Sequence, residues 1–395
     1  MASFSVPTET IFGWGCAAEV GPRARQAGLN RALLVTDRGV RAAGLTEPVE
    51  ASLRGAEIVY DVFDAVSPNP RDVEAEACLA ALVAAQASVL VAVGGGSVID
   101  TAKAAGVLRA NGGRARDWCP AVGGRTPPRP SLPLFALPTT TGTGSEVSGG
   151  AVLTFDLDGR KSKNSIGNCQ PALAFLDPEL VVNLPAPVLT ASGLDAFCHA
   201  TESYVSPHAT LFTRAFSVQA IRTIARAMPD AVQAARAPGA DRRPQMEAML
   251  YAANLAGRSM MGRTGQVHAI SRAVSAFFDT VHGLTNGVLL PIVLAYHAPH
   301  DQALQARLAE AGYLMGDASC APGSIGSDPA VAAARTIDAI ARLRDAVGAP
   351  RRLRDLGVPR DTLPQIAAEA LRTEQAHNPR PATEADLLAI CEQAW

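Results

Sequence analysis

Short apolar runs alternate with longer amphipathic stretches along the first half of this 395-residue chain. The apolar runs have the length and the Val, Leu and Ile content of buried strands, and they lie at 31–36, 57–62, 88–93, 132–137 and 172–176. Helical stretches separate or precede them, near 17–28, 71–86 and 97–111. Strands that alternate with helices in this way predict a parallel sheet covered by helices, and we therefore expect an α/β domain.

The strand signal fades after Asp177, and from about residue 188 onward Ala, Leu, Arg and Glu recur at helical spacing. We expect this second half to be all-helical. A chain of this length is long for one core, and we place the boundary near Leu184-Pro185, which gives domains 1–184 and 185–395. The Pro- and Gly-rich stretch 120–133 is expected to be a surface loop rather than a linker, because a strand signal follows it directly.

Three glycines lie between the apolar run at 88–93 and the helical stretch at 97–111. Gly94, Gly95 and Gly96 allow the backbone to approach a phosphate closely, and the free N–H groups of a helix start favour an anion. Ser97 can cap that helix or donate to a phosphate oxygen. The run is not G-x-G-x-x-G, so that dinucleotide fingerprint is absent. A tight turn that binds no ligand is the alternative.

A second polar loop follows the apolar run at 132–137. Its hydroxyl groups can surround a diphosphate or a ribose, although an ordinary Thr/Gly loop is the alternative; the candidates are Thr139, Thr140, Thr143 and Ser145. Asp37 follows the first apolar run, where a carboxylate can accept hydrogen bonds from a ribose and would repel a 2′-phosphate. These residues favour NAD over NADP, unless Asp37 merely ends its strand.

One carboxylate and three imidazoles in the second half form a candidate metal site. Asp195 and His199 are four residues apart, which places both on one face of a helix. His268 and His282 are 14 residues apart, which is roughly 21 Å along a continuous helix and too far to share one ion. If both bind the metal, the chain must leave the helix between them, and 277–283 is the expected place. Such a ligand set suits Fe(II) or Zn(II), whereas a single buried histidine is more often a core residue.

Composition narrows the class of protein. Hydrophobic residues make up 48% of the chain and charged residues 18%, which indicates a folded globular protein. A formal net charge of −2 gives no reason to expect nucleic acid or a membrane surface as partner. The seven cysteines are scattered without a CxxC pair, which favours a reducing compartment, and the N-terminus shows no signal-peptide pattern. We expect a cytoplasmic enzyme, and the edge of the N-terminal sheet offers a surface for pairing in a homodimer or a larger homo-oligomer.

In combination, these motifs resemble those of the iron-containing (group III) alcohol dehydrogenase family. The resemblance runs nearly end to end through Val35-Thr-Asp37, Pro68-Asn69-Pro70, Gly94-Gly-Gly-Ser97-Val-Ile-Asp100-Thr-Ala-Lys103, Pro138-Thr-Thr-Thr-Gly-Thr-Gly-Ser-Glu146, Asp177-Pro-Glu-Leu180, Gly193-Leu-Asp195-Ala-Phe-Cys-His199, Val267-His268-Ala, His282-Gly283 and Asn378-Pro-Arg380. It implies a dinucleotide-binding α/β domain followed by an all-α domain, a fold shared with dehydroquinate synthase.

The resemblance also implies cofactors and their ligands. It implies a metal, usually Fe(II) with Zn(II) as the alternative, held by Asp195, His199, His268 and His282. NAD(H) is the implied second cofactor, with contacts from Asp37, Asn69, Gly94, Gly95, Gly96, Ser97, Asp100, Thr139, Thr140, Thr143, Ser145 and Lys161. The implied reaction interconverts a small alcohol and an aldehyde or ketone: the metal polarises the substrate oxygen, and hydride passes between carbon and nicotinamide.

At one position the chain departs from the family pattern. Relatives carry a histidine, thought to relay protons, four residues after the first of the two late metal histidines, and this chain has Arg272 there. Arginine does not deprotonate at working pH, so the proton must travel through water, the ribose hydroxyls or another group. A guanidinium near the metal would bind a carboxylate or phosphonate, which predicts an anionic substrate. The alternative is that Arg272 pairs with an acidic residue or points into solvent.

Three other functions use the same residues. A lyase like dehydroquinate synthase uses NAD only transiently, so net NADH production separates it from a dehydrogenase. A metallohydrolase leaves Asp37 and the Thr loop without a task. A non-catalytic nucleotide sensor would lack the metal, which metal analysis of the purified protein tests.

Overall fold

The computed structural model describes residues 5, 7–237, 239–320, 328–373 and 377–395. The start of the chain, on which the expectation about targeting partly rests, therefore lies in part outside the described residues. The chain forms two compact units, an N-terminal unit Met1–Asn183 and a C-terminal unit Leu184–Trp395. Across the described ranges, the helices are too short or too polar to cross a membrane.

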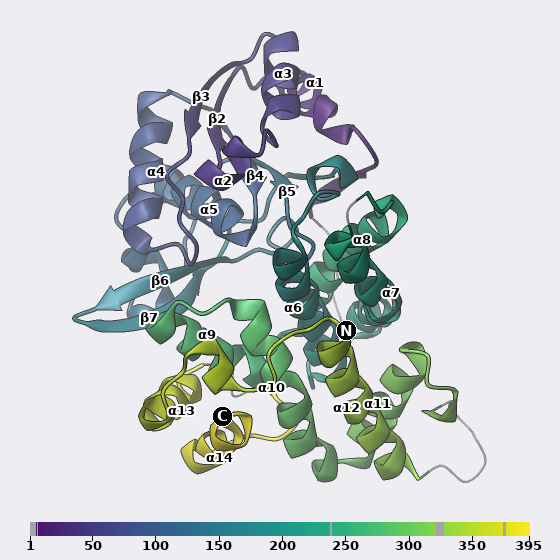
Figure 1. Ribbon diagram of the computed structural model, residues 1–395. Helices are drawn as coiled ribbons and strands as arrows, with labels where there is room; N and C mark the ends of the chain where they lie inside the picture. The colour runs from purple at the N-terminus through teal and green to yellow at the C-terminus, as the bar shows by residue number, and fades with distance from the viewer. Residues whose placement is uncertain (1–4, 6, 238, 321–327, 374–376) are drawn as a thin grey trace. The chain divides into compact units, whose positions relative to one another are not determined.

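A six-stranded sheet forms the centre of the N-terminal unit (Figure 1), and its neighbouring strands all run parallel. The strand order is β1-β8-β5-β4-β2-β3. The strands are β1 (Glu9–Phe12), β2 (Arg31–Val35), β3 (Val59–Phe63), β4 (Val89–Gly94), β5 (Leu134–Pro138) and β8 (Leu173–Leu176). The apolar runs predict five of these six, and the exception is β1, a partly exposed four-residue strand at the sheet edge.

Helices cover both faces of this sheet, as the alternation of elements predicts. Ala32 and Leu34 of β2 pack in one core with α1 and α3, whereas Leu33 and Val35 pack in another with α4 and α5. The helices of this unit are α1 (Val20–Gln26), α2 (Arg38–Ala42), α3 (Glu47–Gly55), α4 (Asp72–Ala84) and α5 (Gly96–Asn111). The predicted α/β fold is confirmed, although the stretch 17–28 begins as a 3₁₀ turn, Cys16–Glu19.

A two-stranded antiparallel hairpin, β6 (Ala151–Leu157) and β7 (Arg160–Ile166), completes the N-terminal unit. The apolar pattern of the sequence does not predict this hairpin, because β7 is mostly polar and only its alternate residues are buried. Asp158 and Gly159 form its turn, both with positive φ, as tight hairpins require. The stretch 120–133 is a loop as predicted, apart from a 3₁₀ turn at Pro120–Val122.

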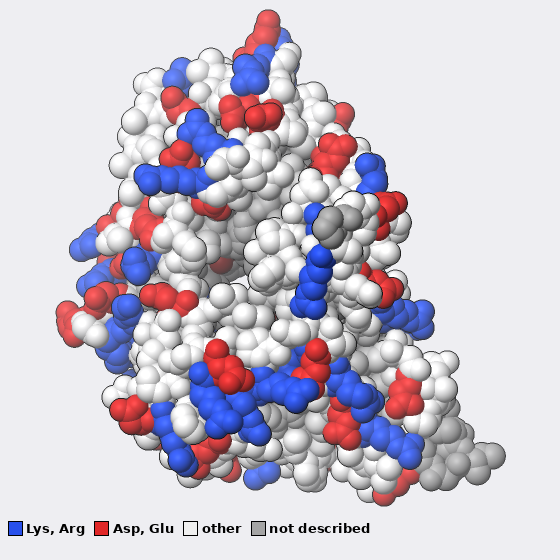
Figure 2. Space-filling model, in the orientation of Figure 1, with Lys and Arg blue, Asp and Glu red and all other residues white. Residues whose placement is uncertain are grey.

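The regular elements of the C-terminal unit are all helices across its described residues, as the sequence predicts. Helix α6 packs against α7, α8 and α10, and α9 packs against α10 and α13. The helices are α6 (Ala186–Val205), α7 (Leu211–Arg236), α8 (Arg243–Ser259), α9 (Gln266–Phe278), α10 (His282–His297), α11 (Gln302–Leu314), α12 (Pro329–Ala346), α13 (Leu363–Leu371) and α14 (Glu384–Ala394). Figure 2 shows acidic and basic side chains interspersed, in keeping with the small net charge.

Candidate functional site

Helix α6 carries the first two candidate metal ligands. Asp195 and His199 lie one turn apart on a buried face, with exposed fractions of 6% and 5%. Their facing atoms, Asp195 Oδ1 and His199 Nε2, are 3.6 Å apart. Ionisable side chains are rarely buried this deeply unless they pair with an opposite charge or bind a metal.

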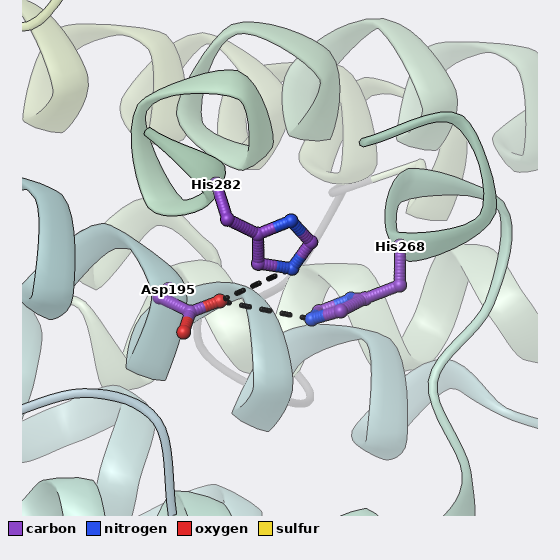
Figure 3. A group of neighbouring side chains, drawn as sticks. All are labelled: Asp195, His268 and His282. Carbon is purple, nitrogen blue, oxygen red and sulfur yellow. Dashed lines mark ion pairs between the residues drawn. The ribbon is translucent and has the colours of Figure 1, made fainter. Parts of the chain in front are cut away.

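The other two candidates come from consecutive helices. His268 lies in the first turn of α9, and α9 ends at Phe278, where Asp279 adopts the left-handed conformation (φ 50°). The chain then turns, and α10 begins at His282. The helix break required by the spacing of the two histidines is therefore present, and both rings point towards Asp195 (Figure 3).

Three of the four candidates, Asp195, His268 and His282, converge with the separations that ligands of a common ion have, and His199 lies beside Asp195. Oδ1 of Asp195 lies 3.7 Å from His268 Nε2 and 3.9 Å from His282 Nε2, and donor atoms of these three residues lie within 4.8 Å of one another. These separations are longer than ordinary hydrogen bonds. Two ligands at about 2.0–2.2 Å from one ion lie roughly 3 to 4 Å apart. One carboxylate oxygen and two imidazole nitrogens thus fit a divalent Fe or Zn ion, and His199 Nε2, 3.6 Å from the same carboxylate oxygen, is the fourth candidate.

The electrostatics of this cluster keep the carboxylate charged. Burial alone raises the pKa of Asp195, but its interactions with the neighbouring imidazoles, led by His199, outweigh burial and hold the pKa well below its usual range. For His268, burial lowers the pKa, while the carboxylates of Asp195 and Glu202 raise it to about 9. A cation bound among these atoms replaces the protons that otherwise balance the carboxylates, so metal and protons compete for the site.

Three polar side chains that the sequence analysis did not name hold the candidate ligands. Glu202 Oε2 lies 2.5 Å from His268 Nδ1, and Ser271 Oγ lies 2.7 Å from His282 Nδ1. Asn286 donates from Nδ2 to Asp195 Oδ1 at 2.7 Å. Each of the three follows a candidate ligand by three or four residues on the same helix, and that spacing is the signal that identifies them.

The glycine turn at 94–96 (the Gly turn) and the polar loop at 139–145 (the Thr loop) lie against each other in the N-terminal unit. A Cβ atom added at Gly95 would lie 3.3 Å from Thr140 Cγ2, and one added at Gly96 would lie 2.8 Å from Thr143 Cγ2. Helix α5 begins here, and Gly95 at its N-cap provides no side-chain cap. Within the described ranges, Thr140 Oγ1 is buried without a hydrogen-bond partner. A narrow, backbone-lined position with an unsatisfied hydroxyl beside a helix start fits a phosphate of a dinucleotide.

Two other cofactor candidates already have partners in the protein. Asp37 accepts from the backbone N–H of Val40 at 2.9 Å and so caps α2. Asp100 is 6% exposed, accepts from Val152 N at 3.0 Å, and lies 3.6 Å from Lys103 Nζ. Lys103 in turn donates to Ser148 Oγ and to the carbonyl of Gly150, so this buried pair joins α5 to the Thr loop.

The remaining candidates occupy the hairpin and the segment before α4. Asn69 has a positive φ of 53°, and its Oδ1 accepts from Lys163 Nζ at 2.8 Å. Lys161 lies two residues before Lys163 on the same face of β7. Only three of the 35 basic residues of the chain are lysines, and Lys103, Lys161 and Lys163 all belong to this unit.

Arg272 lies one helical turn after His268 on α9 and is half-buried. Its neighbour Ser271 contacts His282, so this turn of α9 forms part of the wall around the candidate metal position.

Comparison with known proteins agrees with this arrangement. The model of iron-containing alcohol dehydrogenases matches residues 7–178, and the model of the C-terminal part of that family matches residues 189–395. An NAD-dependent methanol dehydrogenase from Bacillus methanolicus is 35% identical over all of both chains. A solved structure of a 1,3-propanediol oxidoreductase superposes with a TM-score of 0.91 at 35% identity, again over all of both chains.

A more distant structure carries an informative substrate name. A sulfoacetaldehyde reductase from Bifidobacterium kashiwanohense in complex with NAD+ superposes with a TM-score of 0.84 at 25% identity, covering 100% of this chain and 98% of the other. The two family models together span almost the whole sequence. The chain therefore belongs to the iron-containing alcohol dehydrogenase family.

Proposed function

We propose that this protein is a metal-dependent NAD(H) oxidoreductase that interconverts an alcohol and an aldehyde or ketone. The observation that carries the proposal is the convergence of Asp195, His268 and His282, with His199 beside Asp195, in the C-terminal unit of a member of this family. These four side chains would hold the metal, Fe(II) or Zn(II). When both cofactors are bound, the metal acts as a Lewis acid on the substrate oxygen and NAD(H) carries the hydride.

The protein residues prepare the site for this chemistry. Asp195 contributes the negative charge, and Asn286 fixes its Oδ1 through a hydrogen bond of 2.7 Å. Glu202 and Ser271 contact the Nδ1 atoms of two histidines, so that each Nε2 faces Asp195. In the N-terminal unit, Gly95, Gly96 and Thr140 would receive the diphosphate. Asp37 would accept from the ribose through the oxygen that does not cap α2.

Activity assays with defined metals test this proposal. The metal-free protein, and the same protein loaded with Fe(II) or with Zn(II), is assayed with NAD(H) on a panel of alcohols, aldehydes and hydroxy or oxo acids. We expect net, metal-dependent oxidation or reduction of the nicotinamide with at least one substrate. Turnover of a substrate without net NADH formation or consumption would instead place the protein among lyases.

We further propose that the substrate carries an acidic group that Arg272 binds. The position of Arg272, one turn from His268 on α9, supports this proposal, as does the similarity to a reductase named for sulfoacetaldehyde, an anionic aldehyde. A guanidinium binds carboxylates, sulfonates and phosphonates through two parallel hydrogen bonds, a geometry that lysine lacks.

The Arg272→Leu variant separates an anionic from a neutral substrate. Loss of a charge-assisted contact made throughout the reaction should raise KM for an acidic aldehyde about 10- to 100-fold and change KM for a neutral aldehyde of equal length by less than about threefold. Arg272→Lys keeps the positive charge but cannot form two parallel hydrogen bonds. Its KM for the acidic aldehyde should therefore lie between those of wild type and Arg272→Leu. Equal effects on both aldehydes would rule out the contact.

A further inference from the structure

Glu202 lies next to the candidate metal centre although it is not one of its four ligands. It follows Asp195 by seven residues and His199 by three on α6, so all three share one helix face. Its side chain is 5% exposed, and its two oxygens have different partners. Oε2 lies 2.5 Å from His268 Nδ1, and Oε1 accepts from the backbone N–H of Val267 at 2.8 Å.

Cys198, Glu202 and His268 also form a set that could hold a second ion, because their donor atoms lie within 4.8 Å of one another. The distances argue against that use. Two ligands of one ion lie roughly 3 Å or more apart, whereas Glu202 Oε2 and His268 Nδ1 are only 2.5 Å apart. Cys198 Sγ is 3.9 Å from that oxygen and 4.0 Å from that nitrogen. The short contact is therefore a hydrogen bond, with no ion between its atoms.

A hydrogen bond at Nδ1 decides what the other ring nitrogen can do. A neutral imidazole has one N–H and one lone pair, and a carboxylate only accepts hydrogen bonds. Glu202 therefore requires the proton of His268 to be on Nδ1, which leaves the lone pair on Nε2, the atom 3.7 Å from Asp195 Oδ1. The same carboxylate binds Val267 N–H in the first turn of α9, so it also anchors the helix that carries His268.

We propose that Glu202 is a positioning residue that sets the tautomer and the orientation of His268 for metal binding. This inference rests on the proposed metal site. Ser271 allows a comparison with Glu202 within the same site. Its Oγ contacts His282 Nδ1 at 2.7 Å, as Glu202 contacts His268 Nδ1, but it carries no charge. A hydroxyl both donates and accepts, so Ser271 restricts the tautomer of His282 less than Glu202 restricts that of His268.

Metal affinity of the full-length protein tests the inference. Metal-free wild type, Glu202→Gln and Ser271→Ala are titrated with Zn(II) against a chromophoric chelator, and the thermal unfolding of each metal-free protein is recorded. Glutamine keeps the size of Glu202 but offers one oxygen to two N–H donors. We expect Glu202→Gln to weaken Zn(II) binding 10- to 100-fold and Ser271→Ala to weaken it less than about fivefold.

The outcomes distinguish this inference from a purely structural role and from failure of the metal site itself. A Zn(II) affinity of Glu202→Gln within about twofold of wild type overturns it, whether or not the metal-free protein melts at a lower temperature. Binding of two Zn(II) per wild-type chain, with one lost in Cys198→Ala, also overturns it in favour of a second ion. If wild type binds no Zn(II) or Fe(II), the proposed function fails instead.

A second variant keeps the test usable if Glu202→Gln does not fold. Glu202→Asp keeps the charge but is shorter by one methylene, so it can reach only one of its two donors well. We expect its Zn(II) affinity to lie between those of wild type and Glu202→Gln, since the carboxylate still favours the proton on Nδ1. An affinity equal to that of wild type, in a variant that has lost one of the two contacts, counts against the inference.

Discussion

His297 is a histidine whose burial has a consequence for stability. It ends α10, is 2% exposed, and within the described residues its Nδ1 has no hydrogen-bond partner. Burial lowers the pKa of His297 to about 4, and the positive charges of Arg380 and His300 lower it further, while Glu202 opposes them. Between that value and the ordinary 6.5, the unfolded chain binds a proton that the folded chain does not.

His297 should therefore make the folded state less stable as pH falls. The difference of about 2.5 pKa units corresponds to about 3 kcal/mol, absent above pH 7 and almost fully developed near pH 4. His297→Gln removes the titration, so on going from pH 7.5 to 4.5 the wild type should lose about 2 to 3 kcal/mol more free energy of unfolding than the variant does. Denaturant unfolding at the two pH values measures this, and equal losses would contradict it.

Individual site residues differ in how far the sequence predicts them. Asp195 and His199 stand out because an acid and a histidine four residues apart share a helix face, and His268 and His282 stand out because the chain has only seven histidines. Glu202, Ser271 and Asn286 follow candidate ligands at helical spacing, but each contacts a ligand on another helix, so the sequence does not show which ligand each one holds. Asp100 is a cofactor-binding candidate from its place in a motif, and the structure places its carboxylate 3.6 Å from Lys103 Nζ.

At the scale of elements, one glycine sets how closely α10 can approach α6. A Cβ atom added at Gly283 would lie 2.0 Å from the carbonyl oxygen of Ala191 and 3.1 Å from Asp195 Cβ. The first of these is a backbone atom of α6, which cannot turn away as a side chain can. Because Gly283 directly follows His282, any displacement of α10 also moves a candidate metal ligand.

Gly283→Ala should therefore weaken both the fold and the metal site. We expect a loss of about 1 to 3 kcal/mol in the free energy of unfolding, from overpacking, and Zn(II) binding weakened by about tenfold or more. Gly287→Ala is the matched control about one turn later, where the nearest atom to the added Cβ would be Leu194 Cδ1, at 2.7 Å, a side-chain atom that can rotate away. If the two variants bind Zn(II) equally well, close approach at Gly283 does not position His282.

Elements also differ in how clearly the sequence announces them. Strands β2, β4, β5 and β8 are buried on both faces and therefore appear as continuous apolar runs. The hairpin strand β7 pairs its backbone N–H and C=O groups with those of β6, so it needs few apolar residues. Its sequence is Arg160-Lys-Ser-Lys-Asn-Ser-Ile166. Its polar composition hides the strand from a hydrophobicity pattern, although the Asp158-Gly159 turn is a local signal that could have found it.

At the scale of the whole molecule, the two sets of candidate cofactor residues belong to different units. The residues proposed to bind NAD(H) all lie in Met1–Asn183, and those proposed to bind the metal all lie in Leu184–Trp395. Each unit has its own packed core, so neither set needs the other unit to build its local geometry. Binding of the nucleotide and turnover should therefore respond differently to removal of the metal.

Treatment with a chelator should abolish turnover while NADH binding persists. We expect the Kd for NADH, measured by its fluorescence, to change less than about threefold, which corresponds to a coupling free energy below about 0.7 kcal/mol. Hydrogen exchange should locate the effects: Zn(II) should slow exchange in α6, α9 and α10, and NADH should slow exchange at the start of α5 and in the loop after β5. Loss of NADH binding together with the metal would mean that the nucleotide depends on the ion, and the assignment of each cofactor to one unit would then be wrong.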